Sequence, residues 1–201
     1  MTAVDWGLAA RTLPGAATSG DLHLVKAVDN RILFAVVDGL GHGIKAAMAA
    51  KTAVSVINKY ASDSIGSLVK RCHGTLMMSR GAVMTLASLD VPAARLSWLG
   101  VGNVEGVLLR GDAAAIPSSE RLLLHGGLVG YQLPKLQVRS LRVSPGDLLV
   151  LATDGIDASF AHDPGMNEPA AKFAGRILKN HFKGNDDALV LAMRYLGAKH
   201  E

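Results

Sequence analysis

The chain has 201 residues, of which 49% are hydrophobic and 19% charged, proportions typical of one globular domain rather than a disordered chain. Its net charge of +4 is scattered along the sequence and only 4% of the residues are aromatic, which argues against nucleic-acid binding. No apolar run reaches the roughly 18–20 residues that span a bilayer, and the chain does not open with a signal-peptide pattern. We therefore expect a single cytoplasmic domain over residues 1–201, with no membrane and no nucleic-acid partner.

The first part of the chain predicts three strands followed by two helices. A strand is expected over residues 4–11, and apolar residues predict a strand pair over 22–28 and 32–37 around a polar turn. Residues 43–60 are rich in alanine and free of proline, which favours a helix. In a second expected helix, 63–79, apolar residues recur at helical spacing, and the single cysteine falls among them as a core residue.

The rest of the chain predicts strands with one further helix at residues 169–182. Short apolar segments between turn-forming residues indicate strands over 82–89, 95–101, 104–110, 113–116, 138–143, 148–153 and 188–194. This order lacks the regular strand–helix alternation of doubly wound α/β proteins. It predicts instead an α+β fold, in which antiparallel sheets carry helices on their outer faces.

Four short motifs place an aspartate at or beside the end of a predicted strand. Asp38 and Asp154 each follow an apolar strand and precede a glycine, which holds a carboxylate rigidly at a sheet edge. Asp-Gly is also a common turn pair, so either aspartate alone would indicate only a turn. The four motifs are Ser19-Gly20-Asp21, Val37-Asp38-Gly39, Thr153-Asp154-Gly155 and Asn185-Asp186-Asp187.

Carboxylates that converge need their charge neutralised, because burying unpaired charge is very costly. No lysine or arginine lies inside the four motifs, so divalent cations are the other solution. Oxygen ligands without a Cys/His cluster indicate the hard ions Mg or Mn rather than Zn. Two such ions would balance four carboxylates. An ion pair of this kind can activate a bridging water and hydrolyse a phosphate ester without a Ser or Cys nucleophile.

Taken in order, the motifs resemble the metal-dependent protein phosphatase superfamily (PPM, type 2C) in its bacterial SpoIIE-like branch. Between the first two motifs and the last lie Leu-Gly-Val-Gly-Asn at 99–103 and Pro-Gly-Asp-Leu-Leu-Val-Leu-Ala-Thr-Asp-Gly-Ile at 145–156. Each motif alone is weak, but the ordered set from Asp21 to Asp187 is specific. The resemblance implies a four-layer αββα sandwich of two antiparallel sheets flanked by helices, which agrees with the predicted element order.

The resemblance also implies roles for residues of this chain. Asp38 would bridge two Mn or Mg ions, and the carbonyl of Gly39 would bind one of them. Asp154 and Asp186 would hold the other ion, while Asp21 would act on the first ion directly or through water. Asp38 and Asp154 would thus be the catalytic residues.

Two points about the site stay open at this level. Asp187 is an alternative to Asp186, because one of these neighbours would bind metal while the other caps the backbone or faces solvent. Eukaryotic relatives carry a histidine two residues after the bridging aspartate, but Leu40 holds that place here, and no acid role is assigned to His42. The group that protonates the leaving oxygen is therefore not identified.

We expect no sensor or membrane segment ahead of the phosphatase domain, which narrows the resemblance to stand-alone stressosome phosphatases. It implies removal of phosphate from serine or threonine on a phosphorylated regulatory protein of the stressosome scaffold or antagonist type. Such an enzyme would reset general stress signalling. The alternatives are a catalytically silent module that binds a phosphoprotein and a metal-dependent hydrolase of a small phosphate ester. The complete carboxylate set argues against the silent module.

Basic residues also recur along the last predicted helix. Lys172, Arg176, Lys179 and Lys183 fall at helical spacing, opposite an apolar face. This row indicates either a solvated helix face or a docking site for an acidic phosphoprotein.

Overall fold

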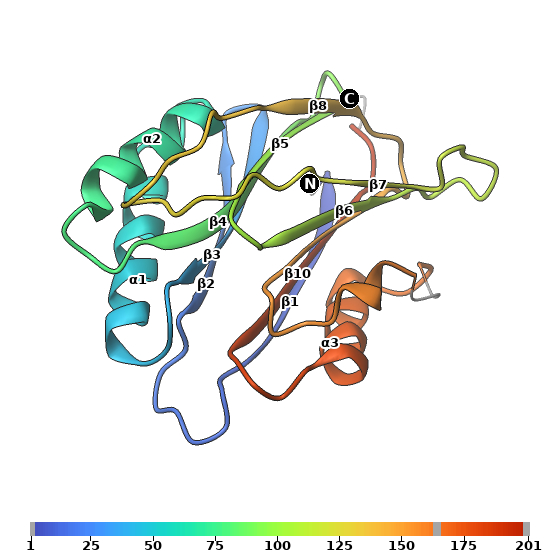
Figure 1. The fold of residues 1–201 in the computed structure, drawn as a ribbon. Coiled ribbons are helices and arrows are strands. Elements are labelled where there is room, and N and C mark those ends of the chain that lie inside the picture. The colour runs from blue at the N-terminus through green and yellow to red at the C-terminus, as the bar shows by residue number, and fades with distance from the viewer. Residues whose placement is uncertain (1–2, 163–165, 199–201) are drawn as a thin grey trace.

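The computed structural model describes residues 3–162 and 166–198 and has four layers (Figure 1). Two five-stranded antiparallel sheets pack against each other, and helices cover their outer faces. The predicted four-layer αββα sandwich is confirmed. Within the described residues, no helix is long and apolar enough to cross a membrane.

Each sheet draws its strands from distant parts of the sequence. Sheet A has the strand order β1 (Val4–Arg11), β10 (Ala188–Tyr195), β9 (Leu148–Ala152), β6 (Glu105–Leu109) and β7 (Ser119–Arg121). Sheet B has the order β2 (Asp21–Val28), β3 (Arg31–Gly39), β4 (Ala82–Asp90), β5 (Arg95–Val101) and β8 (Arg139–Arg142). Because β1 pairs with β10, the first and last strands of the chain are neighbours in sheet A.

Helices α1 (Ile44–Lys59) and α2 (Ile65–Leu76) cover sheet B, whereas α3 (Ala170–His181) covers sheet A. A turn of 3-10 helix, Ala158–His162, precedes α3. The one cysteine, Cys72, is buried where α2 packs on sheet B, as the apolar spacing predicts, and burial raises the pKa of its thiol to about 12.

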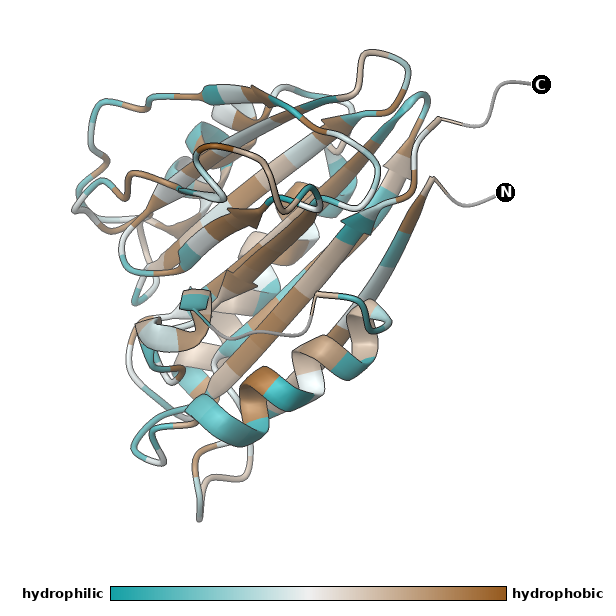
Figure 2. Ribbon diagram, turned by 90° about the vertical axis from the view of Figure 1, so that its right-hand side faces the viewer, coloured by the Kyte–Doolittle hydropathy of each residue, from teal (hydrophilic) through white to brown (hydrophobic). Residues whose placement is uncertain are grey.

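Three apolar cores hold the layers together, and β3 contributes to two of them. Its residues 33–37 are all buried, because sheet B is covered on both faces. Phe34 and Val36 face sheet A, while the residues that alternate with them face α1 and α2. The third core lies between sheet A and α3. Figure 2 shows the hydrophobic colouring concentrated along the strands and the hydrophilic colouring in the connecting loops.

The prediction of a strand over residues 113–116 is wrong. This segment is a turn, and the edge strand of sheet A lies later, at Ser119–Arg121. The Asp112 carboxylate accepts a hydrogen bond from the backbone N–H of Ala114 at 2.8 Å, and the Asp112 carbonyl accepts one from Ala115. These local bonds satisfy backbone groups that a strand would need for its ladder.

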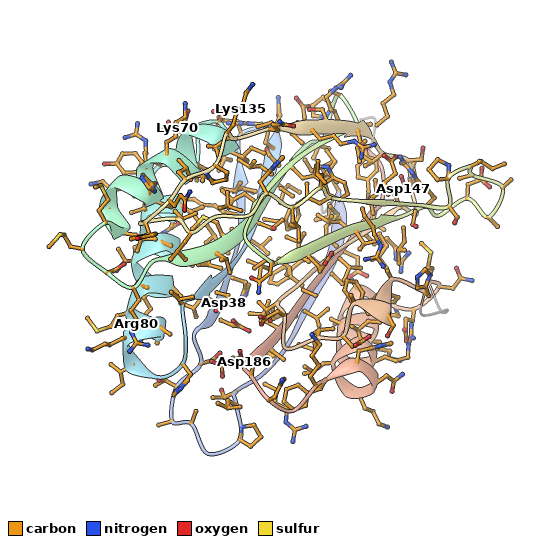
Figure 3. All side chains as sticks on the ribbon, in the orientation of Figure 1. Asp38, Lys70, Arg80, Lys135, Asp147 and Asp186 are labelled. Carbon is orange, nitrogen blue, oxygen red and sulfur yellow. The ribbon has the colours of Figure 1, made fainter. Side chains whose placement is uncertain are left out.

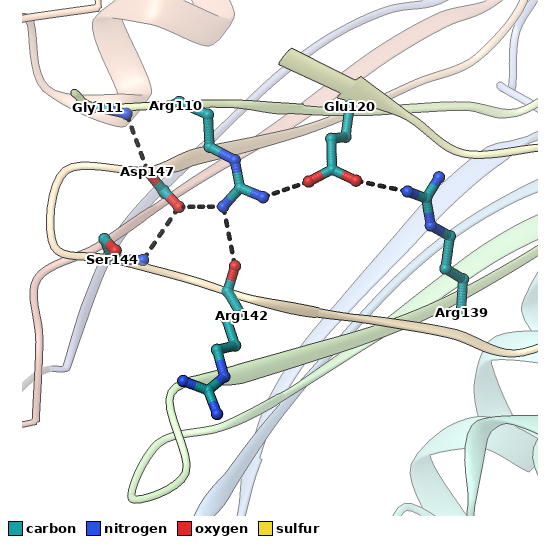
Figure 4. Close-up of polar contacts among 7 residues, drawn as sticks. All are labelled: Arg110, Gly111, Glu120, Arg139, Arg142, Ser144 and Asp147. Carbon is teal, nitrogen blue, oxygen red and sulfur yellow. Dashed lines mark hydrogen bonds and ion pairs between the residues drawn. The ribbon is translucent and has the colours of Figure 1, made fainter. Parts of the chain in front are cut away.

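A largely buried ion-pair network joins the edges of the two sheets (Figure 4). Asp147, only 3% exposed, accepts a hydrogen bond from Arg110 Nη1 at 2.8 Å, and Arg110 also pairs with Glu120 of β7. Glu120 in turn accepts from Arg139 of β8 at 2.6 Å. Main-chain bonds complete the network, from the N–H groups of Gly111 and Ser144 to Asp147 and from Arg110 to the carbonyl of Arg142. Since β7 belongs to sheet A and β8 to sheet B, the network links the two sheets.

We expect Asp147→Ala to lower the free energy of unfolding by about 3–5 kcal/mol, because it removes one of the two carboxylates that pair with the Arg110 guanidinium and the acceptor for the N–H groups of Gly111 and Ser144. Urea denaturation followed by circular dichroism measures the change. Asp63→Ala is the control: it breaks the exposed Asp63–Arg71 pair and should cost about 1 kcal/mol or less. Equal losses in the two variants would contradict a structural role for the network.

Candidate active site

Three of the predicted aspartates line one pocket of about 460 Å³ at an end of the sandwich. Asp38 lies in β3 of sheet B, whereas Asp154 follows β9 and Asp186 precedes β10, both in sheet A. Figure 3 shows Asp38 and Asp186 near one another between α1 and α3. The pocket is therefore built where the two sheets meet, with acidic side chains from each.

Strand register explains why motifs so far apart in the sequence meet here. The antiparallel pairing of β2 with β3 places Asp21 directly opposite Asp38. The pairing of β9 with β10 brings the chain after Ala152 beside the chain before Ala188, so Asp154 lies near Asp186. The two sheets then pack together through their shared apolar core.

The glycine after each central aspartate is required by close packing. A Cβ added to Gly39 would lie 2.1 Å from the carbonyl oxygen of Ala46 in α1. A Cβ added to Gly155 would lie 2.0 Å from the carbonyl oxygen of Asp187. Neither glycine has a left-handed φ, so the two Asp-Gly pairs are places of close backbone approach rather than left-handed turns.

The pKa values of Asp38, Asp21 and Asp154 are raised above the ordinary value of an aspartate. Burial raises the pKa of Asp38 from 3.8 to about 8, and repulsion from Asp21 and Asp154 acts in the same direction. Burial likewise raises the pKa of Asp21 to about 7, although the hydrogen bond from Thr153 opposes the shift. The pKa of Asp154 is raised by burial and by repulsion from Asp186.

The polar groups beside Asp154 are a neutral side chain, Asn103, and a lysine that bonds to the main chain, Lys183. Among the residues that the structure describes, no lysine or arginine forms an ion pair with any of the four predicted ligand aspartates. Asn103, which follows β5, donates a hydrogen bond from Nδ2 to Asp154 Oδ2 at 2.8 Å. The ammonium of Lys183 donates to the main-chain carbonyl of Asp154 at 2.8 Å, and not to its carboxylate.

The donor set suits a hard divalent cation. Within residues 3–162 and 166–198, no three His, Cys, Asp or Glu side chains are already gathered closely enough to hold one ion. The carboxylates of Asp38, Asp154 and Asp186 instead surround the pocket, and the pKa values of Asp38 and Asp154 are raised. Mg²⁺ typically keeps several waters and takes only one or two carboxylates, so an open ring of carboxylate oxygens fits it. The chemistry of these residues therefore fits the predicted cation.

Asp21 and Asp187 are buried next to the pocket but do not line it. Asp21 is buried and does not line the pocket; it accepts a hydrogen bond from Thr153 Oγ1 at 2.7 Å, next to Asp154. Both oxygens of Asp187 are used by the backbone, with Oδ1 accepting from Leu13 N and Oδ2 from Gly20 N, each at 2.7 Å. Of the two neighbouring aspartates, Asp186 therefore lines the pocket and Asp187 fixes the loop before β2.

Sequence reasoning missed the roles of Asn103 and Lys183. Asn103 ends the Leu-Gly-Val-Gly-Asn motif, whose position after a strand was the only available signal. Lys183 was grouped with the basic row of α3, but it bonds to the Asp154 carbonyl. Arg176 of the same row pairs with Glu168 at 2.7 Å. Two of the four members of that row are thus engaged within the protein.

Comparisons with known proteins agree with this fold and site. The family model described as stage II sporulation protein E (SpoIIE) matches residues 28–196. The phosphoserine phosphatase RsbX of Bacillus subtilis (strain 168) is 26% identical over 145 residues, which cover 71% of this chain and 70% of RsbX.

Solved structures show the same architecture. A chain from a structural study of the bacterial stressosome superposes with a TM-score of 0.86 at 27% identity, covering 95% of this chain and 99% of that one. RsbX in complex with magnesium gives a TM-score of 0.83 at 21% identity, with coverage of 95% and 94%. The PP2C phosphatase domain of Bacillus subtilis SpoIIE, in a structure that includes part of its regulatory domain, gives 0.79 at 19% identity, with coverage of 98% and 64%. The chain therefore belongs to the SpoIIE family of metal-dependent, PP2C-type protein phosphatases.

Proposed function

We propose that this protein hydrolyses phosphoserine or phosphothreonine on a regulatory partner protein, using divalent cations held in the pocket between the two sheets. The observation that carries the proposal is the ring formed by Asp38, Asp154 and Asp186. These carboxylates come from both sheets, face one pocket and form no ion pair with a lysine or arginine among the described residues. A ring of this kind has no structural purpose without cations, because its members repel one another.

The residues divide the work of holding the cations. Asp38 and the carbonyl of Gly39 would hold cations from sheet B, Asp154 and Asp186 from sheet A, and Asp21 would act from behind the pocket directly or through water. We propose two ions, Mn or Mg. When bound, such ions supply an activated water and stabilise negative charge on the phosphoryl group. Asn103 orients the Asp154 carboxylate, and the Lys183 ammonium fixes its main chain.

The partner is proposed by similarity and by chemistry together. RsbX is a phosphoserine phosphatase, and one of the similar solved structures comes from a stressosome study. We infer that this chain acts in the cytoplasm on a phosphorylated stressosome scaffold or antagonist protein and thereby resets stress signalling. The exposed His42 does not line the pocket, which supports leaving it without an acid role.

Asp38→Asn should lower turnover of p-nitrophenyl phosphate with Mn²⁺ or Mg²⁺ by at least about 10²–10³-fold, the loss typical of removing one electrostatic stabilising group from an active site. Steady-state absorbance at several metal concentrations measures the effect. Asp157→Asn is the matched control, because Asp157 is exposed and accepts a backbone hydrogen bond from Ser159 that asparagine can also accept. Retained turnover in Asp38→Asn would refute the proposed site.

The metal-free protein should become less stable as the pH rises from about 5 to about 8. The folded-state pKa values of Asp38 (about 8) and Asp21 (about 7) lie above the ordinary value of 3.8, so the folded state binds more protons than the unfolded state in this window. Asp38→Asn removes one of these groups. The metal-free variant should therefore melt higher than the wild type at about pH 8, and the gap should narrow toward about pH 5.

Differential scanning calorimetry with chelator, repeated after adding Mg²⁺, measures both effects. Mg²⁺ should raise the melting temperature of the wild type more than that of Asp38→Asn, because ligand binding to the folded state adds stability. A gap between the two proteins that does not change with pH would contradict the assigned repulsion.

A further inference from the structure

We propose that an exposed surface beside the pocket binds the segment of the protein substrate that flanks its phosphorylated residue. This docking surface consists of Ile44, Lys45, Met48, Met78 and Arg80. It lies where the first turns of α1 meet the connection between α2 and β4. The inference rests on the proposed function, since it names the kind of segment that the same site would accept.

The surface is apolar and open. Ile44 is 71% exposed, Met48 61% and Met78 99%. Ile44 and Met48 are four residues apart, so they share one face of α1. A groove of about 420 Å³ runs between this face and the α2–β4 connection, with Met48 and Met78 in its lining. Flexible methionine side chains adapt to differing apolar partners, which suits a groove that receives a side chain from another protein.

The docking surface continues directly into the carboxylate pocket. Leu40 and Gly41 line the pocket, and only residues 42 and 43 separate them from the start of α1 at Ile44. Gly41 has a φ of +84°, and a Cβ added there would lie 2.8 Å from Arg80 Nη1. The Arg80 guanidinium therefore lies against the backbone of the pocket wall, as Figure 3 indicates by placing Arg80 on the α1 side of Asp38. A chain with its phosphate in the pocket would cross this wall and reach the groove.

The positive charge around the docking surface indicates which residues the substrate segment should carry. Between residues 39 and 89 the only acidic residue is Asp63, which pairs with Arg71. The same stretch holds six basic residues, Lys45, Lys51, Lys59, Lys70, Arg71 and Arg80. Within the described part of the chain, neither Lys45 nor Arg80 pairs with a carboxylate. An acidic side chain on the partner would complement these cations. The occupant is thus a segment with apolar and acidic residues next to its phosphoserine.

Two fluorescein-labelled phosphoserine peptides of equal length test the proposal. One carries Leu and Glu on both sides of the phosphoserine, and the other carries Ser and Gln at those positions. Phosphate release and fluorescence polarisation are measured for the wild type, Arg80→Ala and Met48→Ser, with p-nitrophenyl phosphate as a substrate that has no flanking segment.

The wild type should favour the Leu/Glu peptide by about 10-fold, equivalent to about 1.4 kcal/mol. Arg80→Ala and Met48→Ser should each lose most of this preference while keeping wild-type turnover of p-nitrophenyl phosphate. Two matched controls should keep the preference. Arg95→Ala removes an exposed arginine at the opposite end of sheet B, and Ile116→Ser removes an exposed apolar side chain between β6 and β7.

Several outcomes would overturn the docking proposal. These are equal treatment of the two peptides by the wild type, a preference that survives in both variants, or a preference lost equally in the controls. Wild-type dimerisation in sedimentation that Met48→Ser abolishes, with the peptide preference intact, would assign the surface to a second copy instead. Polarisation needs no turnover, so a binding preference without any phosphatase activity would support docking while the proposed function fails.

Discussion

The repulsion among carboxylates placed at the junction of two sheets is the constraint on which the rest of this structure depends. Asp38 comes from one sheet and Asp154 and Asp186 from the other, so neither sheet alone could form the pocket. Burial and mutual repulsion raise the pKa of Asp38 to about 8. Without cations, repulsion among the carboxylates destabilises the packing of the two sheets against each other. Interactions elsewhere in the fold have to offset this loss of stability.

That stability comes from apolar layers and from bonds that tie the pocket loops to the sheets. The apolar core between the sheets, which contains Phe34 and Trp98, holds the two sheets together. Asp187 uses both carboxylate oxygens on backbone N–H groups of residues 13 and 20, and so joins the loop before β2 to β10. Thr153 bonds to Asp21 and also accepts from Leu189 N, which links sheet B to sheet A behind the pocket. The acidic ring is thus held in place by Asp187 and Thr153, whose side-chain oxygens each form hydrogen bonds within the protein.

Local patterns in the sequence predicted the antiparallel sheets with outer helices and the principal aspartates, whereas the four-layer sandwich was implied by the family resemblance. Buried apolar runs that end in Asp-Gly mark Asp38 and Asp154, and helical spacing marks α2. The division of labour between Asp186 and Asp187 could not be predicted, because it depends on which of them meets the backbone of residues 13 and 20, more than 160 positions away in the chain. The function of Asn103 depends in the same way on a contact across 51 positions. The turn at residues 113–116 was missed because it depends on local hydrogen bonds, in which the carboxylate and the carbonyl of Asp112 accept from the backbone of Ala114 and Ala115.

The distribution of charge gives partner binding and phosphate hydrolysis different requirements for cations. The pocket is acidic, so the phosphate dianion of a substrate is repelled by the ring until cations reverse the local charge. The helical layer next to it is basic in every state of the site, since residues 39–89 carry six lysines and arginines and one aspartate. Attraction between this layer and an acidic partner therefore does not require cations, whereas hydrolysis does. A protein organised in this way can hold an acidic partner beside a metal-free pocket and act on it once the cations bind.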